Sequence, residues 1–165
     1  MTTGKKKIVY IVSHVHKSLA FEWIAKGLQN HYELSFILLN PTESALETFL
    51  LMQKIPVRRI RYRGKKDFMV AFIKTFFVLV IHRPQIIHAH LLDAQLIGLT
   101  SAWLAGVKKR IYSRHTSNYH QVYHPSGVRY DQWSNWLSTH IVSISQATDK
   151  TLSDQSVERL ISEHE

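Results

Sequence analysis

Histidine is the residue type with the clearest chemical potential in this sequence, because several histidines follow short apolar runs. They are His14, His16, His88, His90 and His115. An imidazole can bind a metal ion, transfer a proton or hydrogen-bond the oxygens of a polar ligand. Which of these roles applies depends on whether the fold brings the histidines together.

Apolar runs and helical patterns alternate along the chain with little linker between them. The predicted strands are 7–13, 33–40, 57–62, a run that begins at Ile86, 110–113 and 140–145. The predicted helices are 18–30, 46–54, 68–81, 94–105, 130–138 and 146–164. This order predicts an α/β fold with a Rossmann-like parallel sheet and helices on both faces. At 165 residues the chain suits a single domain, 1–165.

The expected order of the strands gives the histidines a common location. In a sheet ordered 3-2-1-4-5-6, the first, fourth and fifth strands are neighbours at the switch point, where ligands bind. The histidines follow these three strands, so they converge on one crevice. The segment 116–128, with Pro125 and Gly127, reads as a long loop beside it, and loops of this length are usually functional.

Several chemistries are poorly supported by the residues at these strand ends. His88 and His90 point to the same side of a strand, as metal ligands could, but Asp93 is the one acidic residue near them. The chain has no cysteine, no G-x-S-x-G elbow and no glycine between Ser13 and Ser18. We therefore expect no metal site, and a cleft for a ligand that bears phosphate or sugar.

Charge is concentrated in one part of the sequence. The chain has 21 Lys and Arg against 12 Asp and Glu, and the basic segment 54–66 holds seven basic residues and no acid. This segment could attract phosphates of nucleic acid, lipid or nucleotide. It also fits an edge strand that basic side chains protect from unwanted pairing. Both interpretations stay open at this point.

The apolar segment 68–81 is too short for a membrane span, because it has 14 residues and Lys74 interrupts it. We expect a buried helix packed on the sheet, with docking on a membrane surface as the alternative. The first seven residues are polar and basic, and the apolar run 8–12 is too short for a signal peptide. The expected location is cytoplasmic, with peripheral contact at the inner face of a membrane.

The order of these features resembles the N-terminal domain of the family 4 retaining glycosyltransferases, which have the GT-B fold. The opening strand 7–11 and the helix 20–28 match, and 84–90 (PQIIHAH) is similar to the family's "P-D-I-I-H-A-H" strand. The strand 110–116 and the "V-S" strand 141–145 also match. The resemblance implies an acceptor-side domain, without metal or cofactor of its own, whose partner domain binds a nucleotide-sugar donor.

The resemblance also implies roles for individual residues. His115 is similar to the family's cleft histidine near the transferred sugar, so it is the expected catalytic residue. The expected substrate-binding residues are His14, His16, Lys17, Ser18, His90, Arg114, Thr116 and Ser145. Of these, Ser145 suits a helix cap better than a ligand contact.

Two departures from the family pattern limit this expectation. The family often has a glycine pair in its first loop, whereas His14, Val15 and His16 stand here. The chain also ends at Glu165, before any C-terminal donor domain. We expect an inactive fragment of an enzyme that transfers sugar to a lipid-linked or polysaccharide acceptor, and no binding of nucleic acid.

Two other functions compete with this one. The first is a stand-alone module that binds phosphorylated ligands or nucleic acid through the basic segment 54–66, although no RNA-binding signature is visible. The second is a metal-dependent hydrolase centred on His88, His90 and His115.

Overall fold

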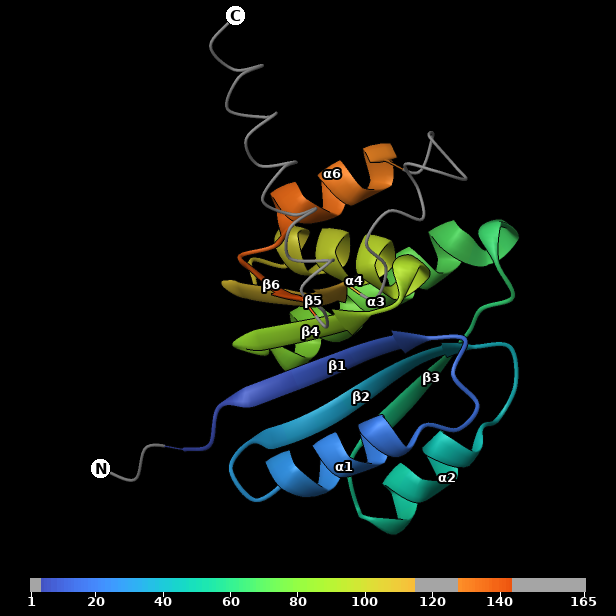
Figure 1. The fold of residues 1–165 in the computed structure, drawn as a ribbon, viewed down its shortest axis with the longest axis vertical. Helices are drawn as coiled ribbons and strands as arrows, with labels where there is room; N and C mark the ends of the chain where they lie inside the picture. The colour runs from blue at the N-terminus through green and yellow to red at the C-terminus, as the bar shows by residue number, and fades with distance from the viewer. Residues whose placement is uncertain (1–3, 115–127, 144–165) are drawn as a thin grey trace, which may run out of the picture.

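The computed structural model describes residues 4–114 and 128–143, and these residues form a parallel β-sheet between two layers of helices (Figure 1). The strands are β1 (Lys7–Ser13), β2 (Glu33–Asn40), β3 (Val57–Arg61), β4 (Ile86–His90), β5 (Lys109–Arg114) and β6 (His140–Ser143). The helices are α1 (Leu19–Leu28), α2 (Ala45–Met52), the short 3-10 helix η1 (Lys65–Asp67), α3 (Phe68–His82), α4 (Leu92–Leu104) and α6 (Val128–Leu137).

The strand order is β3-β2-β1-β4-β5-β6, and every described pair of neighbours is parallel. This confirms the predicted Rossmann-like sheet and its switch point between β1 and β4. It also confirms that the basic strand lies at an edge, since β3 pairs only with β2 among the described strands.

A separate hydrophobic core fills each face of the sheet. On one face, α1 and α2 pack through Phe21, Ala25, Leu46 and Leu50. The opposite face is covered by α3, α4 and α6 (Figure 1). Because both faces are covered, the central strands are apolar on both sides, and all residues of β1 after Lys7 are buried.

Side-chain caps set the ends of several helices. Ser18 accepts a hydrogen bond from the backbone N–H of Phe21 and begins α1, and Ser44 accepts one from Glu47 and begins α2. α4 begins at Leu92, two residues before the predicted start, and the hydroxyl of Ser13 accepts a hydrogen bond from the N–H of Ala94. The predicted helix 146–164 and the predicted strand residues 144–145 lie outside the described residues.

Helix α3 corrects one prediction. It packs on the sheet through Ala71, Val78 and Leu79, as expected, but its outer side is exposed, so it is not a buried helix. The sequence misleads here because a helix that is apolar all round normally lies inside a protein. No helix among the described residues is long and apolar enough to cross a membrane.

Candidate functional site

The carboxyl ends of the central strands lie level with one another. In the register of the sheet, Val12 of β1 pairs with His90 of β4, and His90 pairs with Ser113 of β5. The loop that follows β1 (the first loop, residues 14–18) therefore starts beside the ends of β4 and β5. This edge is the position at which parallel α/β sheets bind ligands.

His14 begins this loop with the backbone conformation of a glycine. Its φ angle is +53°, in the left-handed region that residues with a Cβ seldom adopt. The sequence lacks the family's glycines here, but the chain still makes the tight turn that a glycine would allow. The imidazole of His14 is consequently placed at the open edge of the sheet, and it is exposed.

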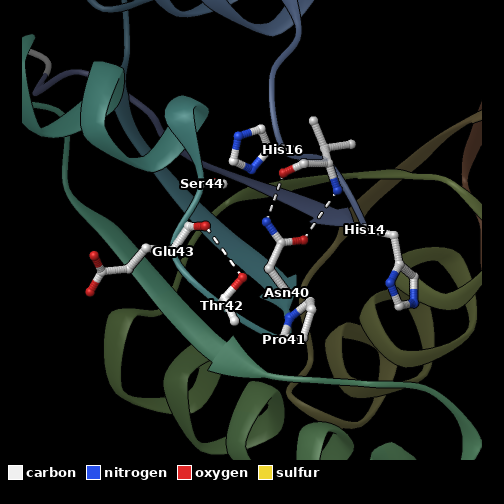
Figure 2. A pocket seen from close by; sticks show the side chains of 8 residues that line it. His14, His16, Asn40, Pro41, Thr42, Glu43 and Ser44 are labelled. Carbon is white, nitrogen blue, oxygen red and sulfur yellow. Dashed lines mark hydrogen bonds between the residues drawn. The ribbon is translucent and has the colours of Figure 1, made fainter.

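Asn40 fixes the same loop from the end of β2 (Figure 2). Its amide oxygen accepts a hydrogen bond from the N–H of Val15 at 3.1 Å, and its amide nitrogen donates to the carbonyl of Val15 at 2.7 Å. The side chain is buried. One side chain thus satisfies both backbone polar groups of Val15, which holds the loop in a single position.

A shallow pocket of about 180 Å³ opens between this loop and the loop that follows β2 (Figure 2). Its lining residues are His14, Val15, His16, Asn40, Pro41, Thr42, Glu43 and Ser44. The pocket offers imidazoles, an amide, hydroxyls and one carboxylate, which suit a ligand rich in hydroxyl groups.

His14 is joined to an acidic residue that lies 79 positions away. Its Nε2 donates to Oδ2 of Asp93 at 3.1 Å, and its ring lies 5.3 Å from the ring of Tyr62. The hydroxyl of Tyr62 donates to the same carboxylate. Burial first, and then the charge and hydrogen bond of Asp93, together raise the pKa of Tyr62 to about 12. The tyrosine therefore stays a hydrogen-bond donor at neutral pH.

The other predicted residues of the first loop have different surroundings. The side chains of His16 and Lys17 are exposed, and His16 lines the pocket. Ser18 caps α1, so its hydroxyl already accepts a hydrogen bond from the helix. The helix start adds the partial positive charge of its free N–H groups to this edge.

His88 and His90 lie side by side, as their spacing predicts, with ring centres 4.1 Å apart. His88 contacts the hydroxyl of Ser113 at 2.9 Å. His90 is only 5% exposed and packs against the rings of Tyr10 and Phe21. It pairs with Val12 at the end of β1, and its role in substrate binding stays a prediction.

The structure does not describe the side chains of four predicted site residues. His115, Thr116 and Ser145 lie outside the described residues. The backbone of Arg114 pairs with that of Ser143, but the description does not extend to its side chain. Within the described parts of the chain, no three His, Asp or Glu side chains form a group that could hold a metal ion.

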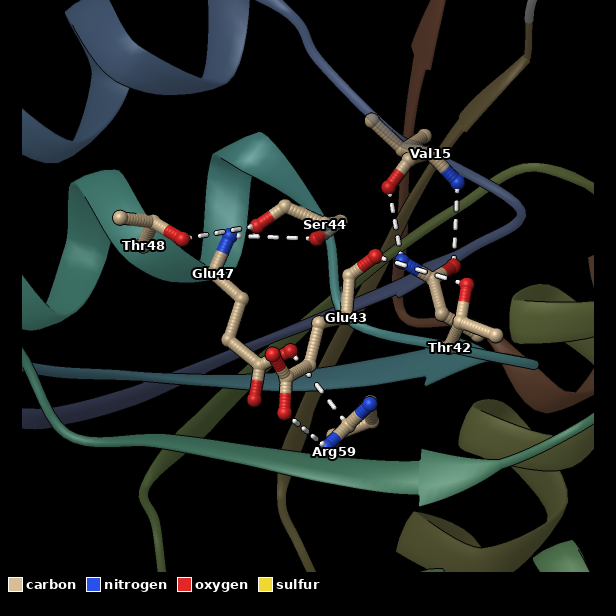
Figure 3. A network of polar contacts seen from close by, with 8 residues as sticks. Val15, Thr42, Glu43, Ser44, Glu47, Thr48 and Arg59 are labelled. Atoms are coloured by element: carbon tan, nitrogen blue, oxygen red, sulfur yellow. Dashed lines mark hydrogen bonds and ion pairs between the residues drawn. The ribbon is translucent and has the colours of Figure 1, made fainter.

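The basic segment 54–66 is partly neutralised by acidic side chains (Figure 3). Arg59 forms ion pairs with Glu43 at 3.2 Å and Glu47 at 3.4 Å, both contributed by the α2 side. Arg63 pairs with Asp67 at 3.1 Å, and the guanidinium lowers the pKa of that carboxyl. The segment is therefore less basic at its surface than its composition indicates.

Reasoning from the sequence missed Asn40 and Tyr62, and it named Asp93 only as an acidic residue near His88 and His90, not as the partner of His14. A signal for Asn40 was present, because a polar residue ends the otherwise apolar run ELSFILLN. Asp93 and Tyr62 gave no such signal, since they reach His14 only through the crossovers of the fold.

The fold and this edge define a class of protein: a Rossmann-like domain of the type that forms half of a GT-B enzyme. The family model of glycosyltransferase family 4 matches residues 11–161. The chain therefore belongs to glycosyltransferase family 4. A search of curated proteins gives no match.

Solved structures with the same fold support the class. HepE from Anabaena, in complex with UDP, is 19% identical with a TM-score of 0.69, and the match covers 90% of this chain and 40% of that one. The galactosyltransferase WaaB of the lipopolysaccharide outer core is 12% identical with a TM-score of 0.66, covering 90% and 42%.

An epimerase has the same fold. The UDP-GlcNAc 2-epimerase of Neisseria meningitidis, bound to UDP-GlcNAc, is 12% identical with a TM-score of 0.68, covering 91% and 43%. At these identities the likeness concerns the fold alone. The chain spans about two fifths of the length of these proteins.

Proposed function

We propose that this chain is the acceptor-side half of a retaining glycosyltransferase that uses a nucleotide-sugar donor. The observation that carries the proposal is the family match over residues 11–161 in a chain that spans about two fifths of similar two-domain structures. The acceptor in this proposal is a hydroxyl group of a lipid-linked sugar or a polysaccharide. A second, donor-binding domain supplies the opposite wall of the cleft.

The carboxyl edge of β1, β4 and β5 is the wall that this chain contributes. The imidazole of His16 and the ammonium group of Lys17 lie exposed there, beside the positive end of α1. Such groups form hydrogen bonds with sugar hydroxyls and stabilise the negative charge of a diphosphate leaving group. His115 follows β5 in the sequence and is the proposed catalytic residue, hydrogen-bonding the sugar that is transferred.

The first loop is held for this role before any ligand binds. Asn40 fixes Val15, and Asp93 fixes the imidazole of His14. A loop that is already in its binding position loses less conformational entropy when the ligand binds. His90 stays a proposed substrate-binding residue at the end of β4, next to Val12 in the sheet.

The proposal includes a cytoplasmic location, a nucleotide-sugar donor held mainly by the second domain and no metal or cofactor in this one. It predicts that the 165 residues alone transfer no sugar, because the proposal assigns donor binding to a second domain and the chain spans about two fifths of similar structures. Sustained transfer from a radiolabelled UDP-sugar to a lipid or glycan acceptor by this chain alone would contradict the fragment's predicted inactivity.

Ligand binding tests the site itself. Saturation-transfer NMR detects weak contacts, so we expect UDP-glucose to give signals with the chain through its diphosphate, although the second domain holds most of the donor. His16→Gln should weaken these signals severalfold. His31→Gln is the matched control, because His31 is also exposed but precedes β2 at the opposite edge of the sheet. Equal weakening by both variants, or no signal with the unmodified chain, would refute the proposed site.

A further inference from the structure

The outer face of α3 is unusually apolar for a surface. Its exposed large hydrophobic side chains are Met69, Val70, Ile73, Phe77, Val80 and Ile81. They recur at intervals of three and four residues and therefore lie along one side of the helix. Lys74 is the one exposed polar residue among them.

The packing of α3 does not account for this face. The helix already contacts the sheet through its other side, where Ala71, Thr75 and Leu79 are buried. A helix that faces water normally carries charged residues on its outer side, and contiguous apolar patches usually mark a contact surface. No described residue covers this face, so the patch fits a partner outside the described chain.

Exposed tryptophans also lie on the helices that cover the same side of the sheet as α3. α3, α4 and α6 cover that side together (Figure 1). Trp103 of α4 lies 5.6 Å from Trp136 of α6, and Trp133 lies 5.5 Å from Trp136, with all three rings about half exposed. Exposed tryptophans of this kind are typical of surfaces that meet the boundary between water and lipid.

The charges around α3 indicate that the partner surface is anionic. Residues 61–83 contain six Arg and Lys residues against one acid, Asp67, which is paired with Arg63. Lys65 and Lys66 precede the helix and Arg83 ends it, and all three are exposed. An apolar face with cations at both ends and in its middle complements a surface that is apolar inside and anionic outside.

We propose that the outer face of α3 docks on an anionic phospholipid bilayer. The helix has 15 residues, too few to span the membrane, so it lies in the plane of the interface. Ile73 and Phe77 enter the boundary between headgroups and acyl chains, while Lys66 and Lys74 meet the lipid phosphates. This inference refines the membrane location in the proposed function, but it rests on residues that take no part in the sugar site.

The test is flotation of the chain with vesicles of phosphatidylglycerol and phosphatidylcholine, compared with phosphatidylcholine alone. We expect binding to the anionic vesicles and roughly tenfold less to the neutral ones. The variants Ile73→Ser with Phe77→Ser, and Lys66→Glu with Lys74→Glu, should each lower anionic binding by roughly tenfold.

The matched control is Leu51→Ser with Met52→Ser on α2. These side chains are 60% and 68% exposed, comparable with Ile73 at 46% and Phe77 at 57%, but they belong to the other face of the sheet. The control should bind anionic vesicles like the unmodified chain. Circular dichroism checks that each variant is folded.

Three results would overturn the inference: no binding to either vesicle, equal binding to both, or equal loss in the control. Sedimentation velocity tests the rival occupant, a second copy of the chain. Conversion of a dimer to a monomer by Ile73→Ser with Phe77→Ser, with vesicle binding unchanged, would also overturn it. Binding of UDP-glucose is measured without lipid, so failure of the sugar site and failure of the lipid surface are distinguishable.

Discussion

Asn40 offers the sharpest test of how the first loop is held. Replacing Asn40 with alanine removes both hydrogen bonds to Val15, at 3.1 Å and 2.7 Å. Each lost hydrogen bond costs about 1 kcal/mol, and leaving a partly buried peptide group unpaired adds to that cost. Because Val15 is only partly buried, water can replace some of this bonding. We therefore expect Asn40→Ala to lower the free energy of unfolding by about 2 kcal/mol.

The measurement is urea unfolding followed by circular dichroism, with Asn30→Ala as the matched control. Asn30 is exposed, so its replacement should change the free energy of unfolding by no more than about 0.5 kcal/mol. Asn40→Asp keeps the acceptor for the Val15 N–H but loses the donor to its carbonyl. At neutral pH this variant should lose at least as much stability as Asn40→Ala. A loss at Asn40 no larger than that at Asn30 would refute the reasoning.

Two further predictions concern packing and ionisation. A Cβ added at Gly98 would lie 2.9 Å from Cδ1 of the buried Ile11, so Gly98→Ala should lower the free energy of unfolding by about 1 kcal/mol. Ile11→Val removes that methyl group, so it should lower the free energy of unfolding less in the Gly98→Ala variant than in the unmodified chain. Additive losses of the two substitutions in urea unfolding would contradict the contact. Asp93→Asn should lower the pKa of Tyr62 from about 12 part of the way toward 10.0, because burial still raises it, and leave that of Tyr10 unchanged in a tyrosinate absorbance titration. Both tyrosines have raised pKa values when folded, so the stability that they contribute is complete below about pH 10 and is lost as the pH rises toward about 12. Unchanged stability over that range would contradict the burial of these hydroxyls.

The sheet could be predicted from the sequence because its physical determinants are local. Apolar runs of strand length alternate with helical patterns, and the right-handed connection of parallel strands leaves few arrangements. The boundaries of the helices and strands were predicted less accurately, because side chains far away in the sequence set some of them. The hydroxyl of Ser13, for example, accepts a hydrogen bond from Ala94 near the start of α4, and nothing near residue 94 signals that contact.

The candidate site could be predicted only where it follows strand ends. His14 and His16 were found because the topology places the loop after β1 at the switch point. The partners of His14 were not found, because Tyr62 approaches it only after two crossovers of the chain and Asp93 only after three. For the apolar segment 68–81 a buried helix was the expectation and surface docking only the alternative, since the apolar pattern is the same for a buried helix and for one that contacts another surface.

The central claim is that the carboxyl edge of β1, β4 and β5 is the sugar-binding wall of a glycosyltransferase. The most direct test is a histidine side-chain and backbone NMR spectrum of the chain, recorded while UDP-glucose is added. We predict shifts at His14, His16 and the adjoining residues of the first loop, together with His115. Shifts confined to the opposite edge of the sheet, near Lys7 and Gln85, or no shifts at all, would contradict the claim.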